Sequence, residues 1–548
     1  MRVFAKDMEI IAGQDITVEL SSLLKEFANS DEQKELVFEP GEYLISSAKC
    51  DIEMLNITNT VGDDEFKEGG VPHKAAVALN LKNIRNLKIT GNGATFVIDG
   101  KVTNMAVQGC DNLEICGIAF KTVNPDFHEI KVVKKTAFSV NFELCGDSLY
   151  EKNENGKGFS FIGTDYHSDF YKGRINWGYL HKIFAEDENH VVRVKHPFFT
   201  AVSIKEIEKN LFRVRCPNTS RFTVGETYGI YDAIRKYNGI FIGQSKDIVL
   251  NDVKQYFNYG LALVCQDTEN LTVDGAYFAP EKNSGRYIAS CADFMQVCMC
   301  KGDIKITNGY FEGAGDDCLN VHGIHFAVIK IDGQKLIVRF MHPQSHGFNP
   351  LHKGDLIEYI DPKTLLTNGK AAIKASKLIN EVDIELEVDS TDGAVIGDVI
   401  EDITMCPSLY FAGNTLNRII TRGLLITTRG NVLVENNHFM NTEMDAILVS
   451  NDAKNWYESG RVLNAVIKGN RFDYCGGYYV EILPENGSTG SIVHGDFIVE
   501  ENDFNSPAGG GINAKSAQRL TIRNNKVNDL KSDFVKAKDI KRLKSDIG

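Results

Sequence analysis

Three carboxylates in two short segments carry the residue types that acid–base chemistry needs. Asp316 and Asp317 are adjacent in the Gly-rich segment 313–323 (GAGDDCLNVHG), and Asp293 lies 23 and 24 residues upstream of them in CADF. That interval is close to one coil of a parallel β-helix, where equivalent positions of neighbouring coils stack about 4.8 Å apart. We therefore expect the three carboxylates to converge on one face, as hydrolysis of a glycosidic bond requires.

Stacked acids are electrostatically unfavourable, and the repulsion raises the pKa of at least one of them. A solenoid could fill the same column with Asn or Thr without that repulsion. An Asp-Asp pair alone in a turn is more often a cap for local amides. Asp293 at the coil interval favours a functional site, and so do Asn320 and His322, which alternate along the strand that follows the pair.

Further candidates follow from counting along the repeat. Six residues after Phe311 comes Asp317, and six after Phe439 comes Asp445, so Asp445 is expected to continue the column of acids. Arg429 and Glu481 are expected on flanking coils, and Trp456 lies in a loop where an indole could stack on a sugar face. His322 could equally be a buried histidine at a domain junction. The candidate substrate-binding residues are Asn320, His322, Asp445, Arg429, Glu481 and Trp456.

An internal repeat indicates the architecture that positions these residues. Nine segments share a polar residue, alternating apolar residues, an Asn, Gly or Asp and then, in eight of the nine, an aromatic residue. Their last residues are Phe96, Phe120, Phe257, Phe278, Phe311, Phe439, Phe472, Phe504 and Val527. The alternation and the turn residues indicate strands, and repetition on this scale indicates a solenoid. Because parallel crossovers are almost always right-handed, we predict an all-β, right-handed parallel β-helix.

Two long gaps interrupt the repeat, and both are rich in alternating strands. We interpret them as inserted β-barrel-like domains. The predicted divisions are 1–120 for the N-terminal cap and first coils, 121–238 for the first insertion, 239–323 for the central coils with the acids, 324–407 for the second insertion and 408–548 for the C-terminal coils. The second insertion leaves the helix directly after the acids, so we expect it to wall the site.

Composition narrows the classes of partner. The formal net charge of −14 disfavours nucleic acid and polyuronic acid, and no apolar run is long enough to suggest a membrane protein. The N-terminal residues lack the apolar stretch of a signal peptide, so a cytoplasmic location is expected. The twelve cysteines are scattered and show no zinc-finger spacing. No metal or cofactor is therefore expected.

The order ADF followed by DDCLNVHG resembles glycoside hydrolase family 110, and the resemblance extends over the β-helix and both insertions. Members of that family remove terminal α-1,3-linked galactose from blood-group-B-type or linear Galα1-3Gal glycans, with inversion and without a metal. The resemblance implies that Asp316 protonates the leaving oxygen, while Asp293 and Asp317 hold and deprotonate the attacking water. It also implies an exo-acting enzyme whose partner is an oligosaccharide with a terminal α-galactose.

Two other functions fit the same fold. Polygalacturonase-type β-helix enzymes also present three aspartates, but they bind a polyanion, which the net charge disfavours. A non-catalytic carbohydrate-binding solenoid would use aromatic platforms and would not need three converging acids. Replacing Asp316 by Asn separates these classes, because an enzyme would lose turnover while a binding module would be unaffected.

Overall fold

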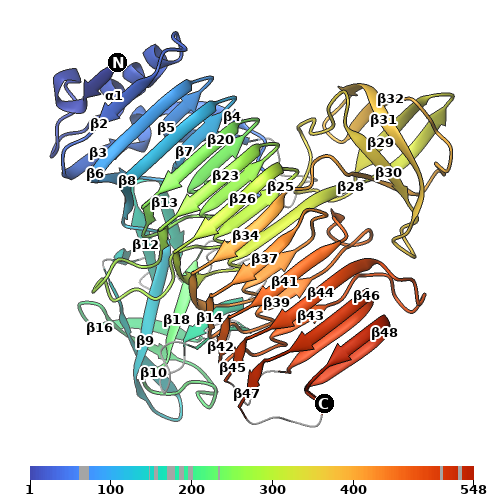
Figure 1. Ribbon diagram of the computed structural model, residues 1–548. Helices are drawn as coiled ribbons and strands as arrows, with labels where there is room; N and C mark the ends of the chain where they lie inside the picture. The colour runs from blue at the N-terminus through green and yellow to red at the C-terminus, as the bar shows by residue number, and fades with distance from the viewer. Residues whose placement is uncertain are drawn as a thin grey trace.

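The computed structural model describes residues 1–60, 73–146, 148–152, 158–169, 179–183, 190–195, 201–231, 235–505, 510–528 and 533–547. Strands of successive coils pair in parallel and form one elongated solenoid, with two separate β-domains attached to it (Figure 1). The N-terminus and the C-terminus lie at opposite ends of the solenoid. The chain is thus a parallel β-helix, as the repeat predicts.

The strands of the solenoid form three faces, and two long strands near each end contribute to two faces. The first face contains β1 (Arg2–Phe4), β2 (Lys34–Val37), β6 (Arg85–Asp99), β8 (Asp111–Val123), β20 (Lys246–Asn251), β23 (Glu269–Asp274), β26 (Lys301–Thr307), β34 (Ser408–Ala412), β37 (Val432–Glu435), β41 (Asn464–Lys468), β44 (His494–Glu500), β46 (Ile512–Arg523) and β48 (Val535–Ser545).

The second face follows the first along each coil. It contains β3 (Gly41–Ser46), the later parts of β6 and β8, β21 (Lys254–Gln255), β24 (Tyr277–Phe278), β27 (Tyr310–Ala314), β35 (Thr415–Ile419), β38 (His438–Met440), β42 (Arg471–Asp473), β45 (Asp503–Phe504) and β47 (Lys526–Val527).

The third face carries the candidate acids at its strand starts. It contains β4 (Asp51–Leu55), β5 (His73–Lys82), β7 (Thr103–Gln108), β19 (Ile240–Gly243), β22 (Leu263–Gln266), β25 (Met295–Cys298), β28 (Leu319–Asp332), β36 (Leu424–Ile426), β39 (Ile447–Val449), β43 (Val480–Ile482) and the first residues of β46 and β48. Among the described residues, β4 and β5 pair antiparallel, whereas the other stacked strands of this face pair in parallel.

The repeat corresponds to stacked side chains inside the solenoid. Phe439, Phe472 and Phe504 occupy equivalent positions of three coils, with ring centroids 4.9 and 5.0 Å apart. A ladder of buried asparagine amides runs beside them and donates from coil to coil. In one coil the repeat position is Gln255, which pairs with Phe278, whereas Phe257 lies two residues further and packs outside the main core.

The two ends of the solenoid differ. Helix α1 (Thr17–Phe27) buries Leu20, Leu24 and Phe27 against the first coils, so it closes the N-terminal end of the core. At the other end β48 is the last strand, and within the described residues no helix covers it. No helix in the described part of the chain is long and apolar enough to span a membrane.

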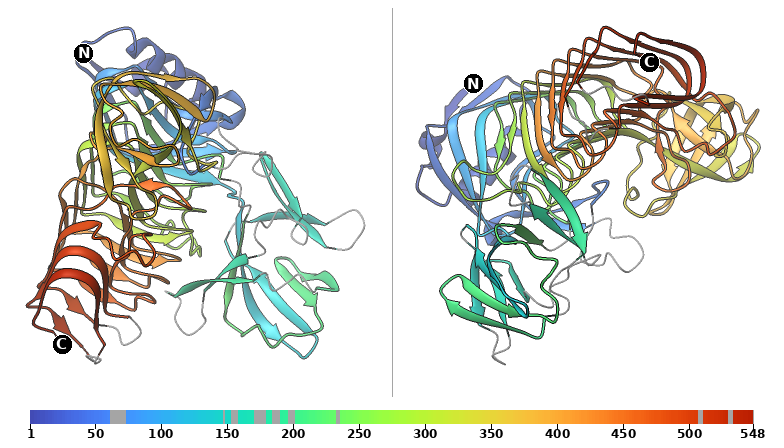
Figure 2. Two further views of the ribbon diagram at one scale, coloured as in Figure 1. Left: turned by 90° about the vertical axis from the view of Figure 1, so that its right-hand side faces the viewer. Right: turned by 90° about the horizontal axis from the view of Figure 1, so that it is seen from below.

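The first insertion lies between β8 and β19. It contains a seven-stranded antiparallel sheet in the order β15-β14-β18-β9-β10-β17-β16 and a three-stranded sheet β11-β12-β13. The strands are β9 (Phe127–Lys135), β10 (Ser139–Leu144), β11 (Leu149–Lys152), β12 (Phe159–Gly163), β13 (Tyr166–Asp169), β14 (Tyr179–Ile183), β15 (Val191–Lys195), β16 (Ser203–Glu208), β17 (Leu211–Arg215) and β18 (Thr227–Tyr231). Figure 2 shows this domain beside the solenoid.

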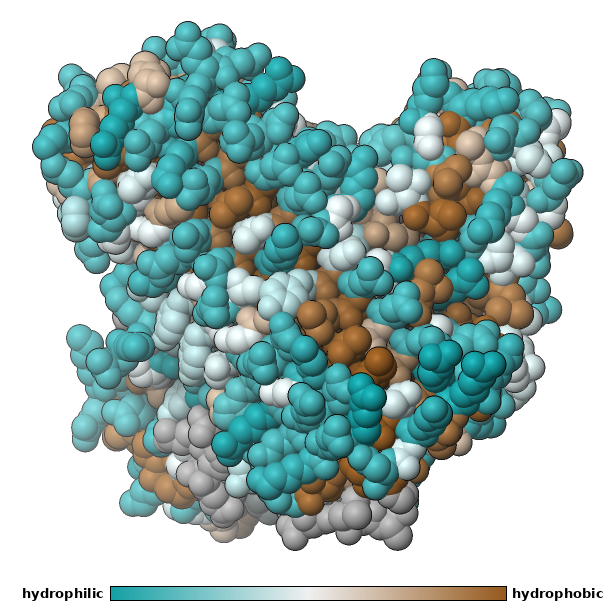
Figure 3. All heavy atoms as spheres, viewed as in Figure 1, coloured by the Kyte–Doolittle hydropathy of each residue, from teal (hydrophilic) through white to brown (hydrophobic). Residues whose placement is uncertain are grey.

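The second insertion is a closed six-stranded barrel. Its strands pair in the ring β28-β29-β32-β31-β30-β33 and back to β28. The additional strands are β29 (Lys335–Phe340), β30 (Leu356–Ile360), β31 (Thr367–Leu378), β32 (Asp383–Val388) and β33 (Val399–Asp402). β28 starts in the third face of the solenoid and continues into the barrel without a break (Figure 1). In the space-filling view a deep notch separates this domain from the first coils (Figure 3).

Candidate active site

The three acids lie where the chain enters the third face. β25 and β28 pair with Met295 opposite Leu319, so Asp293 and Asp317, each two residues before its strand, occupy equivalent positions of adjacent coils. The amide of Phe294 donates to the carbonyl of Asp317 at 2.9 Å, which fixes this alignment. Gly315 allows the close approach, because a Cβ there would lie 2.5 Å from the carbonyl oxygen of Cys291.

Asp317 is buried and fully engaged. Its Oδ1 accepts hydrogen bonds from the Thr421 hydroxyl at 2.5 Å and from the Arg422 amide at 3.0 Å. Its Oδ2 lies 3.2 Å from the Arg422 guanidinium. These partners fix the orientation of the carboxylate and favour its ionised form.

Electrostatics separate the two buried acids. Burial, reinforced by the charges of Asp316 and Asp317, raises the pKa of Asp293 well above its ordinary value. Burial also raises the pKa of Asp317, to about 6, while the Arg422 guanidinium opposes the rise. Asp293 therefore holds its proton to higher pH than Asp317 does, so the two buried acids differ in the way that divides acid and base roles in enzyme sites.

Asp316 is the accessible member of the trio, with 33% of its side chain exposed. The first inserted domain reaches it: Arg193 on β15 donates to the carbonyl of Gly315 at 3.3 Å and lies 3.9 Å from the Asp316 carboxylate. The first insertion therefore also contributes a wall to the site, at the starts of the strands. The sequence predicts a wall from the second insertion only.

Arg422 occupies the coil between Asp317 and Asp445. Leu319, Leu424 and Ile447 are successive register partners, so the positions two residues before them form the column Asp317, Arg422, Asp445. Sequence reasoning missed this cation because its coil has Leu416, not an aromatic residue, at the repeat position. Counting six residues from Leu416 reaches Arg422.

Asn320 and His322 point outward from β28, toward the strand that closes the site. Asn320 donates to Glu458 at 2.9 Å, and His322 Nε2 lies 3.8 Å from the same carboxylate oxygen. Glu458 belongs to β40 (Glu458–Ser459), which pairs antiparallel with β28. Gln296, one coil away, lies 2.8 Å from His322 Nε2. Glu458 and Gln296 are thus site residues that sequence reasoning missed.

Two buried amide oxygens at this position lack a hydrogen-bond partner in the described part of the chain. Within the described residues neither Asn320 Oδ1 nor Gln296 Oε1 has a hydrogen-bond partner, although both side chains are almost fully buried. Buried amide oxygens without partners are costly.

Trp456 lies two residues before Glu458 and contacts the second insertion. Its indole, 49% exposed, stacks on the His342 ring with centroids 4.4 Å apart. Burial, with the nearby Arg235 charge, lowers the pKa of His342 to about 4, so the histidine is neutral near pH 7. Asp452 holds this loop by accepting the amides of Lys454 and Trp456.

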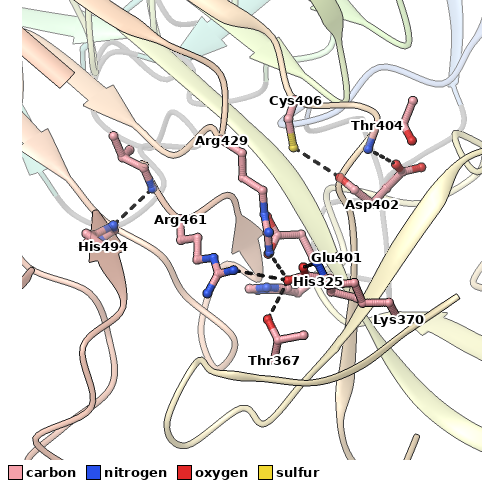
Figure 4. A network of polar contacts seen from close by, with 12 residues as sticks. His325, Thr367, Lys370, Glu401, Asp402, Thr404, Cys406, Arg429, Arg461 and His494 are labelled. Atoms are coloured by element: carbon pink, nitrogen blue, oxygen red, sulfur yellow. Dashed lines mark hydrogen bonds and ion pairs between the residues drawn. The ribbon is translucent and has the colours of Figure 1, made fainter. Parts of the chain in front are cut away.

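The structure places Arg429, predicted as a substrate-binding residue, in an ion-pair cluster and not among the contacts of the acids. Its guanidinium, with a side chain 9% exposed, contacts Glu401 at 2.7 Å and Glu358 at 2.6 Å, at the junction of barrel and solenoid (Figure 4). Thr367 and Lys370 also contact Glu358. Two of the three guanidinium nitrogens thus bind barrel acids, and sequence alone could not reveal these partners.

Asp445 and Glu481 form a separate acidic pair further along the solenoid. Asp445 lies two coils from Asp317 and accepts the amide of Tyr478 at 2.7 Å. Burial raises the pKa of Glu481 to about 7, and the Asp445 charge adds to the rise while a hydrogen bond from Asn513 opposes it. The structure therefore brings together Asp293, Asp316, Asp317, Asn320 and His322, and it places this pair beyond Arg422.

Two family models match the chain. The model of the GLAA-B β-barrel domain II matches residues 335–400, within the closed barrel. The model of the right-handed β-helix region matches residues 403–539, which confirms the predicted fold and its handedness.

Curated relatives span most of the chain. The α-1,3-galactosidase A of Bacteroides thetaiotaomicron is 31% identical, over 92% of this chain and 87% of that protein. The α-1,3-galactosidase A of Bacteroides fragilis (strain YCH46) is 33% identical, over 89% of this chain and 78% of that protein. The α-1,3-galactosidase B of Phocaeicola vulgatus is 28% identical, over 80% of this chain and 72% of that protein.

Proposed function

Because this chain belongs to the α-1,3-galactosidases of glycoside hydrolase family 110, and is therefore a glycosidase acting on oligosaccharides, we propose that it releases terminal α-1,3-linked galactose with inversion. The observation that carries the proposal is the stacking of Asp293 and Asp317 in equivalent positions of adjacent coils, with Asp316 next in the chain to Asp317 and Arg422 beside Asp317. A buried proton-holding acid, an ionised acid and an accessible acid supply the groups for inverting hydrolysis.

The roles follow from exposure and charge. Asp316, the accessible carboxyl, protonates the leaving oxygen as the galactose departs. Asp317, ionised beside Arg422, takes the proton of the attacking water. Asp293 keeps its own proton and orients that water by hydrogen bonding. Inversion requires the acid and the carboxyl across the attacking water to stand about 6.5–9.5 Å apart. One coil step plus a diagonal offset, as between Asp316 and Asp293, is compatible with that span.

Exo action is supported by the walls around the acids. Arg193 approaches from the first insertion, and β40 closes the side next to β28. Asn320 and His322 on β28 and Glu458 on β40 supply the polar side chains for the hydroxyls of one terminal sugar. A pocket that buries one sugar favours cleavage at a chain end over cleavage within a chain.

The rival function, a polygalacturonase-like enzyme, would need cations for uronate carboxylates at the acids. Polygalacturonase-type enzymes carry an Arg-x-Lys element for this purpose. One such tripeptide occurs in this chain downstream of the acids, at Arg542-Leu543-Lys544. It lies on β48, the last strand of the solenoid, several coils beyond β28. The cations at the acids, Arg422 and Arg193, instead approach the carboxylates of Asp317 and Asp316.

A substrate panel tests the proposal. The protein is incubated with linear Galα1-3Gal, the branched B-type trisaccharide, Galα1-4Gal, Galα1-6Glc and polygalacturonate, and released sugar is quantified by chromatography. We expect galactose only from the α-1,3-linked substrates, and their relative rates decide between branched and linear preference. Release of galacturonate, or equal release from all three linkages, would contradict it.

A further inference from the structure

Ion pairs run between coils along the outer side of the first face. A cation of one coil lies opposite an acid of the next, so each charge is neutralised within the solenoid. The pairs and their distances are Lys88–Glu114 at 2.9 Å, Lys246–Glu269 at 3.1 Å, Lys468–Glu435 at 3.2 Å and Arg523–Glu500 at 2.7 Å. Cross-strand pairs of opposite charge stabilise a sheet, whereas like charges opposite each other destabilise it.

The last coil breaks this pattern. Asp496, Arg519 and Arg542 are successive register partners, and Arg519 lies 3.6 Å from Asp496. Arg542 therefore lies opposite another arginine, and Lys544 lies opposite the neutral Thr521. No acid in the described part of the chain lies within ion-pair distance of Arg542 or Lys544.

These side chains line a groove of about 690 Å³. Arg542 lies opposite Arg519 and Lys544 lies opposite Thr521, so the three cations are grouped around the Thr521 hydroxyl. Arg523 also lines the groove, and so does one acid, Asp546, which accepts the amide of Asn524. The described residues of 510–547 contain nine Lys and Arg and three Asp, a net charge of +6 in a chain of net charge −14. The groove is thus a local concentration of cations at the C-terminal end of the molecule.

We propose that this groove binds a sulfated segment of a glycan, separately from the proposed hydrolysis. A sulfate ester presents three terminal oxygens, and two guanidinium groups, an ammonium and a hydroxyl offer enough donors for all of them. The groove spans three coils, roughly 10 Å, which suits one or two sugars and not a long polyanion. Lysines on an edge strand also prevent aggregation, but that role does not require arginine stacked on arginine.

Binding of short oligosaccharides tests this proposal. Affinity for a fluorescently labelled chondroitin sulfate hexasaccharide is measured by anisotropy at low ionic strength, beside unsulfated chondroitin of equal length and a short single-stranded oligonucleotide. The variant Arg542→Glu/Lys544→Glu removes two unpaired cations. Its matched control is Lys374→Glu/Lys377→Glu, which makes the same charge change at exposed positions of β31 in the barrel.

We expect the wild type to prefer the sulfated hexasaccharide, the groove variant to bind it about tenfold more weakly, and the barrel control to bind it within about twofold of wild type. Arg542→Gln/Lys544→Gln should give a smaller loss and guards against misfolding of the charge-reversed variant. Hydrolysis of Galα1-3Gal should be the same in all of them. Equal weakening in the control, equal binding of unsulfated chondroitin, or tighter binding of the oligonucleotide would overturn the proposal.

Discussion

At the scale of single residues, burial and one arginine, Arg422, set the pKa values of the two buried acids. Asp293 and Asp317 are both buried, and burial disfavours a charged carboxylate. Arg422 and Thr421 restore the ionised form of Asp317 only, because Asp293 has no such partner in the contacts described. One coil step therefore separates a proton-holding acid from a base.

The pH dependence of kcat/KM should report Asp317. Its pKa is about 6 and the base is active only when ionised, so kcat/KM should fall as the pH drops through about 6. Arg422→Gln removes the charge that lowers this pKa, so the acid limb should move to higher pH. Arg422→Lys should leave the limb close to its original position. An acid limb that stays in place in Arg422→Gln would contradict this assignment.

Leaving-group chemistry should separate the roles of Asp316 and Asp317. An aryl galactoside with a good leaving group needs little protonation, so Asp316→Asn should retain activity on it while losing about 10²–10⁴-fold on Galα1-3Gal. Asp317→Asn should lose activity on both substrates, because the water still needs a base. Steady-state kinetics on the two substrates measure this, and the opposite ordering would exchange the two roles.

The sequence repeat predicts the acids of the candidate site but not Glu458. Asp293, Asp316 and Asp317 could be found because the coil interval is visible in the sequence. Glu458 reaches the site through the antiparallel pairing of β40 with β28, which no repeat signals. The pairing of Arg429 could not be predicted, because the acids that neutralise it, Glu358 and Glu401, lie in a different domain.

At the scale of elements, β28 connects the segment that carries Asp316 and Asp317 to the barrel. The strand begins beside the acids, pairs with β40 at Gly323 and Ile324, and continues into the barrel. His325 donates its amide to the carbonyl of Tyr457, and its ring contacts the carbonyl of Asp452, so the same strand also holds the loop of Trp456. The barrel therefore acts as a frame for one wall of the site.

Deleting residues 324–407 should abolish hydrolysis. The deletion removes Ile324, the register partner of Glu458, and the contacts of His325. Glu458 therefore loses the position in which it accepts the hydrogen bond from Asn320. The remaining solenoid should still give a β-sheet signal in circular dichroism. A folded deletion variant that kept full turnover of Galα1-3Gal would refute the role of the barrel.

Arg429→Met should destabilise the protein without removing a substrate contact. It leaves Glu358 and Glu401 buried without their shared cation, which costs about 3–5 kcal/mol of unfolding free energy. The control Arg85→Met breaks an exposed pair with Asp31 and should cost under about 1 kcal/mol. Urea unfolding gives both values, and KM at low temperature should be unchanged. A raised KM would return Arg429 to the substrate site.

The repeat made most elements of the solenoid predictable, and the insertions limited the rest. Alternating apolar residues gave the strands, because one face of each must be buried in the solenoid core. The coil at Gln255 was misaligned by two residues, since Phe257 offered the aromatic that the pattern required. The barrel was recognisable as antiparallel strands, but its closure depends on β28 pairing with β33, which sequence spacing does not show.

At the scale of the whole molecule, the solenoid is asymmetric in both shape and charge. Helix α1 covers the first coils and two β-domains flank the middle (Figure 2). Within the described residues, Arg542 and Lys544 on the last strand, β48, have no acidic partner. Catalysis is placed in the middle, where both insertions contribute to one face. The proposed glycan groove is placed at the far end, so the two can be altered independently.

The configuration of the first released sugar tests the central claim most directly. Proton NMR follows the anomeric signals while the protein cleaves Galα1-3Gal, before mutarotation mixes the anomers. Water held by Asp317 and Asp293 on the face opposite Asp316 predicts β-galactose first. Initial α-galactose would mean a covalent intermediate and would contradict the assigned roles of all three acids.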